Sequence, residues 1–225
     1  MTIRPEQIPL DLPHDPARGR DDLLVFDRMR DALALVDAWP RWRSPVIMLV
    51  GPPGSGKSHL AAIWRERSRA RALTPSDADT AAGRAAEGPV LVEDAERAGF
   101  SDDMLFHLIN SVRENATSML MTARRLPAAW DVRLPDLASR LKAVTVAEIG
   151  PPDEETLAGV MVKLFADRQL VVDPRVLSYL TARMERSFEA ANSLVERLDR
   201  LALARGTPVS RALAAEVLGA GGESD

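Results

Sequence analysis

The sequence lacks residues on which several classes of protein depend. It contains no cysteine, which excludes both a disulfide framework and a thiolate metal site. The three histidines, His14, His59 and His107, are scattered along the chain, a spacing that argues against a histidine metal cluster. No apolar run approaches the length of a transmembrane helix, and the N-terminus has no apolar core of the signal-peptide type. We therefore expect a cytosolic, cytoplasmic protein with no membrane contact.

A surplus of basic residues is also missing. The 29 Lys and Arg residues nearly balance the 33 Asp and Glu residues and leave a net charge of −4, whereas non-specific DNA binding requires a basic surface. Four arginines lie between Arg65 and Arg71, and a solvated helix face explains them better than a local basic patch does. We expect no direct sequence-specific DNA binding.

Composition divides the chain into three parts. Residues 1–20 are rich in Pro, Asp and Arg and are expected to form a flexible arm. Residues 21–150 alternate short apolar runs with stretches of helical periodicity, which is typical of an α/β domain with a parallel sheet. Residues 151–225 show only helical periodicity followed by a polar tail, which predicts a small all-helical lid domain.

Four buried strands are expected in the α/β domain, with helices between them. Ser101 is the expected N-cap of one of these helices, and Asp153 is the expected N-cap of the first helix of the lid. The segment Leu73–Glu87 is weakly patterned and is interpreted as a loop with a frayed helix. The predicted strands are Pro45–Val50, Pro89–Glu93, Ser118–Thr122 and Ala143–Ile149.

The motif GPPGSGKS, Gly51–Ser58, matches the P-loop pattern G-x-x-x-x-G-K-[ST] in full and lies between a predicted strand and a predicted helix. Its glycines allow backbone amides to surround phosphate groups at the start of a helix. Lys57 is expected to reach the β- and γ-phosphates, and Ser58 to ligate Mg²⁺. The sequence leaves open whether the nucleotide is ADP or ATP. The expected nucleotide contacts are Gly51, Pro52, Pro53, Gly54, Ser55, Gly56, Lys57, Ser58 and His59.

Polar residues end two further predicted strands. Glu93 and Asp94 follow the second strand, where Glu93 would bind Mg²⁺ and Asp94 would polarise the attacking water. Thr122 ends the third strand, and its hydroxyl would contact a γ-phosphate or the lytic water. The alternative is that all three residues simply end strands beside solvent.

Together, the P-loop, the acidic pair, the sensor strand and the helical lid resemble an AAA+ ATPase. Two segments narrow the resemblance to the DnaA family. LPDLASRLKAVTVAEIGPP, Leu134–Pro152, is similar to the segment that carries the arginine finger, and Arg140 falls on the finger position. RSFEAA, Arg186–Ala191, is similar to the start of the lid helix that supplies a second sensor arginine, which makes Arg186 the candidate for that role. A surface arginine is the alternative for each.

Within that family, the chain resembles the DnaA-related Hda regulators, called HdaA in alphaproteobacteria, over about residues 6–218. Only one helix and a polar tail are expected after Gly206, without room for a helix-turn-helix domain. QIPLDL is similar to the Q-L-x-L-x-L peptide with which Hda proteins bind the DNA polymerase sliding clamp. An arm that folds back onto its own domain is the alternative. The residues that would enter an apolar groove of the clamp are Gln7, Ile8, Leu10 and Leu12.

The resemblance implies a regulator that meets ATP-bound DnaA on the clamp and stimulates ATP hydrolysis with Arg140 in trans. Its own nucleotide would be mainly structural, and the Glu-Asp pair, where the DnaA family usually has Asp-Asp, implies weak intrinsic hydrolysis. Two alternatives stay open. An autonomous ATPase of the helicase-loader type predicts fast turnover and a homo-oligomer in ATP. A nucleotide-locked clamp adaptor predicts no effect on hydrolysis.

Overall fold

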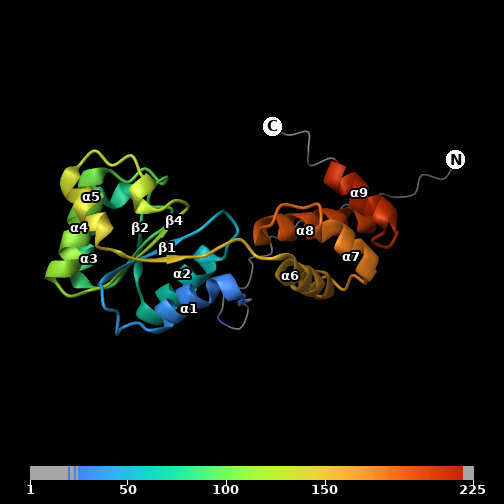
Figure 1. Ribbon diagram of the computed structural model, residues 1–225, viewed down its shortest axis with the longest axis horizontal. Helices are drawn as coiled ribbons and strands as arrows, with labels where there is room; N and C mark the ends of the chain where they lie inside the picture. Colours follow the sequence, from blue (N-terminus) through green and yellow to red (C-terminus); the bar gives the residue numbers. More distant parts are fainter. Residues whose placement is uncertain (1–19, 21–22, 24, 220–225) are drawn as a thin grey trace. The chain divides into compact units, whose positions relative to one another are not determined.

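The computed structural model describes residues 20, 23 and 25–219. It divides into two compact units, one ending at Pro151 and the other beginning at Pro152 (Figure 1). The arm residues predicted to bind the clamp lie outside the described residues. They are Gln7, Ile8, Leu10 and Leu12.

The first unit is built on a parallel sheet of five strands in the order β2-β3-β4-β1-β5. The predicted α/β class is confirmed, and the four predicted strands are present with ends that differ by one or two residues. Every residue of β1 and β4 is buried, as expected for central strands covered on both faces. The strands are β1 (Val46–Val50), β2 (Arg71–Leu73), β3 (Val90–Val92), β4 (Met119–Ala123) and β5 (Thr145–Glu148).

Helices cover both faces of this sheet (Figure 1). Because side chains alternate along a strand, Val46, Met48 and Val50 of β1 share one face, where they join a core cluster with residues of α3, α4 and α5. Ile47 and Leu49 point to the opposite face, on the side of α1 and α2. The helices are α1 (Arg30–Asp37), α2 (Lys57–Ser68), α3 (Ala78–Glu87), α4 (Asp102–Glu114) and α5 (Pro135–Lys142).

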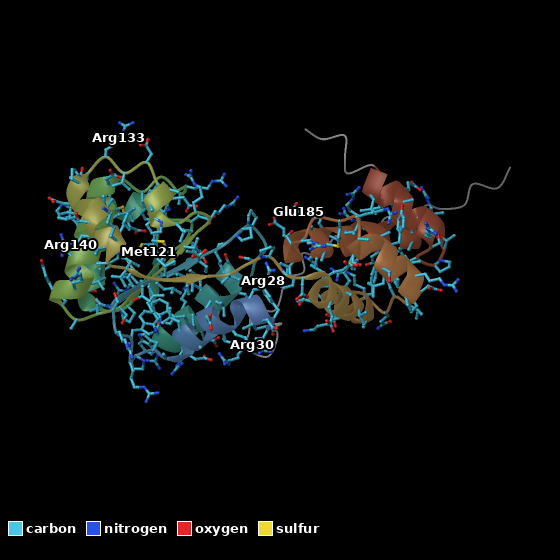
Figure 2. The ribbon with its side chains drawn as sticks, viewed as in Figure 1. Arg28, Arg30, Met121, Arg133, Arg140 and Glu185 are labelled. Atoms are coloured by element: carbon cyan, nitrogen blue, oxygen red, sulfur yellow. The ribbon has the colours of Figure 1, made fainter. Side chains whose placement is uncertain are left out.

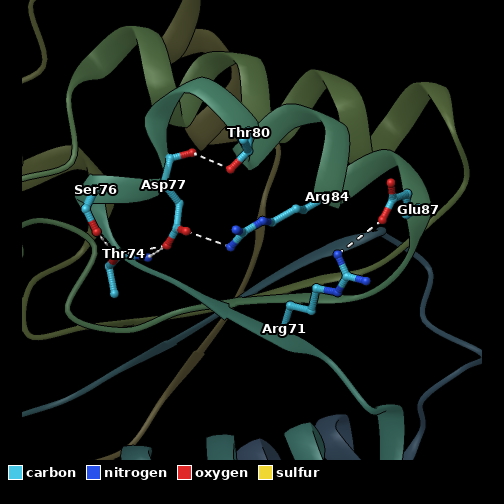
Figure 3. Close-up of polar contacts among 7 residues, drawn as sticks. All are labelled: Arg71, Thr74, Ser76, Asp77, Thr80, Arg84 and Glu87. Atoms are coloured by element: carbon cyan, nitrogen blue, oxygen red, sulfur yellow. Dashed lines mark hydrogen bonds and ion pairs between the residues drawn. The ribbon is translucent and has the colours of Figure 1, made fainter.

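The segment 73–87 corrects the prediction of a loop with a frayed helix. It completes the short edge strand β2 and then forms the ten-residue helix α3 (Figure 3). At the turn before α3, the Thr74 N–H donates to Asp77 Oδ2 at 2.8 Å, and Arg84 donates to Asp77 Oδ1 at 2.6 Å. Ala81 and Ala85 are buried in the core beside α4. The helix packs through alanines, so its apolar periodicity is faint in the sequence.

The two predicted helix N-caps are confirmed. Ser101 Oγ accepts a hydrogen bond from the Met104 N–H at 3.1 Å at the start of α4. Asp153 Oδ1 accepts one from the Thr156 N–H at 2.8 Å at the start of α6 (Glu154–Asp167). In both cases a side-chain oxygen satisfies an amide that has no partner within its helix.

The second unit is helical throughout its described elements. Its core is formed by buried aliphatic and aromatic side chains on the apolar faces of these helices, such as Leu157, Phe165 and Leu198. No helix in the described part of the chain is both long and apolar enough to cross a membrane. The helices are α6 (Glu154–Asp167), α7 (Pro174–Thr181), α8 (Phe188–Arg205) and α9 (Arg211–Gly219).

Candidate functional site

A glycine-rich loop joins β1 to α2, where the P-loop motif was found. Gly54 and Gly56 have φ angles of 64° and 89°, a region that favours glycine. A Cβ added at Gly51 would collide with the carbonyl oxygen of Ile149, so the loop runs too close to its neighbour for a side chain. Gly56 is the N-cap of α2, and no described side chain caps this helix. The uncapped amides suit a phosphate group.

Lys57 folds back over this loop. Its Nζ donates hydrogen bonds to the carbonyl oxygens of Gly51 at 2.8 Å and Pro52 at 2.7 Å. The lysine is 6% exposed, whereas Ser58, the next residue on α2, is exposed and His59 is half-buried. The ammonium therefore lies inside the loop, and the Ser58 hydroxyl is accessible to a ligand. The individual nucleotide contacts stay predictions.

The charge of Lys57 depends on residues that follow two neighbouring strands. Burial lowers the pKa of Lys57 below its ordinary value of 10.5, while Asp94 acts to raise this pKa, Arg124 to lower it and Glu96 to raise it. Asp94 and Glu96 come after β3, and Arg124 comes after β4. The P-loop and the carboxyl ends of β3 and β4 thus lie within electrostatic range of one another.

The acidic pair and Thr122 meet at this edge of the sheet. The Asp94 N–H donates to Thr122 Oγ1 at 2.9 Å, and the Ala95 N–H donates to the Thr122 carbonyl oxygen at 2.9 Å. Asp94 has a φ of 46°, so the chain turns sharply directly after Glu93, which is exposed. Thr122 itself is 1% exposed. Its hydroxyl already accepts the Asp94 N–H, so the predicted phosphate contact would use its remaining O–H.

The sequence prediction missed two residues at this edge, Arg124 and Glu96. Arg124 Nη2 lies 3.9 Å from Asp94 Oδ2, and the Arg124 N–H donates to Glu96 Oε1 at 2.6 Å. Glu96 Oε2 is buried and has no hydrogen-bond partner within the described residues. Arg124 lies two positions after Thr122, and Glu96 lies two positions after Asp94. This closeness in sequence to predicted site residues was the signal that could have identified them.

The donors at this edge fit a magnesium ion that arrives with a nucleotide. Ser58 and Glu93 offer the hydroxyl and carboxylate oxygens that Mg²⁺ prefers. Among the residues that the structure describes, no three His, Cys, Asp or Glu side chains are arranged to hold a metal ion. Mg²⁺ commonly takes one or two protein ligands and completes its shell with phosphate oxygens and water, so this donor set is sufficient.

Arg140 lies at the other edge of the same sheet. It is on the last turn of α5, directly before β5, and β5 runs parallel to β1 with Ile47 opposite Thr145. The P-loop follows the carboxyl end of β1, so the length of a five-residue strand, roughly 15 Å, separates the two places. Figure 2 shows Arg140 on the far side of the unit from Arg28, whose side chain lies against Gly150 beyond β5. Arg140 is not placed to touch a nucleotide in the P-loop of its own molecule.

Arg186 lies in the helical unit, directly before Ser187, the N-cap of α8. Its Nη2 is 3.9 Å from Glu154 Oε2, and both side chains are more than half exposed. Such a pair contributes little to stability and leaves the guanidinium accessible. The role of Arg186 as a sensor stays a prediction.

The strand order, the loop between β1 and α2 and the acidic turn after β3 define an AAA+ nucleotide-binding fold, as predicted. No family model matches the chain. Over 118 residues, 52% of its length, the chain is 26% identical to the chromosomal replication initiator protein DnaA of Cutibacterium acnes. That match spans about a quarter of the initiator, 24% of its length.

Two solved structures of DnaA share this fold. Domain III of the replication initiation protein DnaA of Thermotoga maritima superposes with a TM-score of 0.75 at 18% identity, covering 93% of this chain and 98% of that one. AMPPCP-bound DnaA from Aquifex aeolicus gives a TM-score of 0.70 at 18% identity, covering 85% and 68%. The similarity to DnaA predicted from the motifs is thus confirmed.

Proposed function

We propose that this chain binds an adenine nucleotide at its P-loop and regulates the initiation of DNA replication by stimulating ATP hydrolysis on a DnaA initiator. Its similarity to DnaA supports the replication context, and the relative solved with AMPPCP supports the nucleotide. In this proposal Arg140 acts in trans as the arginine finger, and the N-terminal arm binds the sliding clamp.

The position of Arg140 carries this proposal. A finger must insert beside the γ-phosphate, yet Arg140 is separated from its own P-loop by the length of β1. Arg140 is half-buried on α5, a helix anchored by the buried Leu137 and Leu141. An arginine on a packed helix, remote from the P-loop of its own molecule, suits a nucleotide held by another molecule.

The chemistry asked of Arg140 is charge stabilisation. As the bond to the γ-phosphate breaks, negative charge builds on the phosphate oxygens, and a guanidinium beside them lowers the barrier. Such a finger is worth about 10³–10⁵ in rate in other systems. The finger transfers no proton and forms no covalent bond.

The chain's own nucleotide is proposed to be structural. The P-loop amides and Lys57 would hold the phosphates, while Ser58 and Glu93 would hold Mg²⁺. Asp94, the residue expected to polarise water, has Arg124 beside it at 3.9 Å. A carboxylate that shares its charge with a guanidinium orients water less effectively, which supports slow intrinsic hydrolysis.

The arm supplies the proposed tether to the clamp. Gln7 would anchor an extended peptide through its amide, and the three aliphatic side chains that follow would be buried, each contributing roughly 1.5–3 kcal/mol if fully desolvated. This part of the proposal rests on the sequence and on the resemblance to the Hda peptide. The aliphatic residues are Ile8, Leu10 and Leu12.

An autonomous ATPase is the second candidate function. The gathering of Lys57, Asp94 and Thr122 at one edge favours it, because these groups are also the parts of a hydrolytic site. That candidate predicts fast turnover by the chain alone, which a nucleotide-locked adaptor or a regulator does not require.

The test measures ATP turnover by the cognate DnaA in the presence of clamp loaded on DNA. Wild type should accelerate turnover, whereas Arg140→Ala and a Gln7→Ala/Leu10→Ala arm variant should not. Fast turnover by this chain without DnaA would favour the autonomous ATPase. Stimulation equal for wild type and Arg140→Ala would exclude the finger.

A further inference from the structure

Arg140 is one of three arginines that line a single cavity. The other two are Arg43, in the loop that leads into β1, and Arg113, on the last turn of α4. The cavity has a volume of about 220 Å³ and lies at the amino ends of β1 and β5, between Pro45 and Val144. Three separate elements therefore bring arginine residues to one cavity.

No carboxylate lines this cavity. Within the described residues, none of the three arginines makes an ion pair or a side-chain hydrogen bond. The nearest acids along the chain, Glu114 and Asp136, share helices with Arg113 and Arg140 but do not line the cavity. Positive charge is thus gathered without a counter-charge of the chain's own.

We propose that Arg43 and Arg113 act together with Arg140 as one cleft that receives the terminal phosphates of a nucleotide bound to the partner ATPase. The inference rests on the proposed function and adds two residues to it. Guanidinium groups bind phosphate oxygens through paired, charge-assisted hydrogen bonds.

The size of the cavity supports this occupant. Pockets that enclose a whole small molecule usually measure about 300–1,000 Å³, more than the 220 Å³ available here. Phosphate groups presented by another protein need less room, because the base and the ribose stay in the partner.

The partner carries out the reaction in its own site. Water attacks the terminal phosphorus, the bond from that phosphorus to the β-phosphate oxygen breaks, and ADP and inorganic phosphate leave with a proton from the water. The charge that develops on the phosphate oxygens is shared by three guanidiniums instead of one.

A simpler explanation exists for two of these arginines. Arg113 and Arg140 each lie in the last turn of a helix, where a positive charge stabilises the helix dipole. Arg43 belongs to no helix, and the dipole explanation does not account for it. The dipole explanation also predicts that replacing Arg113 or Arg140 lowers the thermal stability of this chain and leaves turnover by the partner unchanged.

The experiment compares Arg43→Ala, Arg113→Ala and Arg140→Ala at saturating concentrations in the stimulation assay. Arg133→Ala is the matched control, because Arg133 is exposed on the same unit and lies well apart from Arg140 (Figure 2). We expect the maximal DnaA turnover to fall about tenfold or more for Arg43→Ala and Arg113→Ala, and to stay unchanged for the control. Affinity for ATP-bound DnaA should fall more than affinity for ADP-bound DnaA.

The outcomes separate the two proposals. Suppose that wild type stimulates and Arg140→Ala does not, but the other two variants behave like the control. The proposed three-arginine cleft is then wrong, and the role of Arg140 as the arginine finger is retained. Equal weakening of binding to ATP-bound and ADP-bound DnaA would instead mean that Arg43 and Arg113 contact protein carboxylates, which also overturns the cleft. No stimulation by wild type would remove the proposed function and the cleft together.

Discussion

The carboxyl edge of the parallel sheet, where its strands end, and the amino edge, where they begin, differ in how their charged side chains are paired. At the carboxyl edge, Lys57 is held by loop carbonyls and Asp94 lies beside Arg124. At the amino edge, the arginines of the cavity have no such partners in the described part of the chain. An edge whose charged side chains are paired suits a ligand that the molecule itself keeps bound. An edge that carries only unpaired positive charge suits an anionic ligand presented by another molecule.

The largest expected effect on ADP binding comes from removing Lys57, and removing Arg140 at the other edge should have almost none. Lys57→Ala should weaken binding of ADP by this chain about 100-fold or more, since charge-assisted hydrogen bonds contribute roughly 1.5–3 kcal/mol each. Arg140→Ala should leave that affinity within about twofold. Calorimetry on the purified variants measures both, and an equal loss in the two variants would contradict the separation of the edges.

A smaller effect, on stability, is expected from removing the hydrogen bond between the Asp94 N–H and Thr122 Oγ1, which links the ends of β3 and β4. Thr122→Val keeps the shape of the buried side chain but leaves the Asp94 N–H without its acceptor, which should cost about 1–3 kcal/mol in the free energy of unfolding. Urea unfolding measures this cost. Thr80→Val is the control, because the Thr80 hydroxyl is exposed and its bond to the Asp77 carbonyl oxygen is long, 3.3 Å. If both variants lost the same free energy of unfolding, the hydrogen bond between Asp94 and Thr122 would not stabilise the fold as claimed.

The smallest effect should arise away from both edges, at the turn before α3. Hydrogen bonds from the Thr74 backbone and hydroxyl, followed by the charge of Arg84, lower the pKa of Asp77. A carboxyl whose pKa is lower in the folded chain stabilises the fold above its ordinary pKa of 3.8, and this stability is lost as pH falls through the lowered value.

Thermal unfolding as a function of pH tests that statement. Asp77→Ala should lower the Tm at pH 7 by less than Thr122→Val does, and the difference from wild type should shrink below pH 3.8. Asp77→Asn keeps an acceptor for Thr74, so its Tm should lie between those of wild type and Asp77→Ala. A difference that stays constant with pH would show that the carboxylate charge has no part in it.

The sequence was most informative where a function is local in the chain. The P-loop motif predicted the loop between β1 and α2, because every group that a phosphate needs lies within Gly51–Ser58. Strand β1 was predictable because it is apolar throughout, and β4 because all of its residues except Thr122 are apolar. The helix α3 was predicted only as a frayed helix within a loop, because alanines form its buried face. The strand β2 was missed because only one of its three residues is buried.

Assembled features could not be predicted in the same way. Arg43, Arg113 and Arg140 are separated by 70 and 27 positions in the chain, and only the parallel order of β4, β1 and β5 brings their elements to one edge. Glu96 meets the Arg124 N–H for the same reason, through the pairing of β3 with β4.

The most direct test of the central claim asks whose nucleotide turns over. DnaA is loaded with ATP labelled on its γ-phosphate, this chain is loaded with unlabelled ADP, and the two are mixed on clamp-loaded DNA for a single turnover. We predict that labelled phosphate is released faster than by DnaA alone, and that Arg140→Ala abolishes the acceleration without loss of its own ADP. Release that is no faster than by DnaA alone, or that survives Arg140→Ala, would contradict the account.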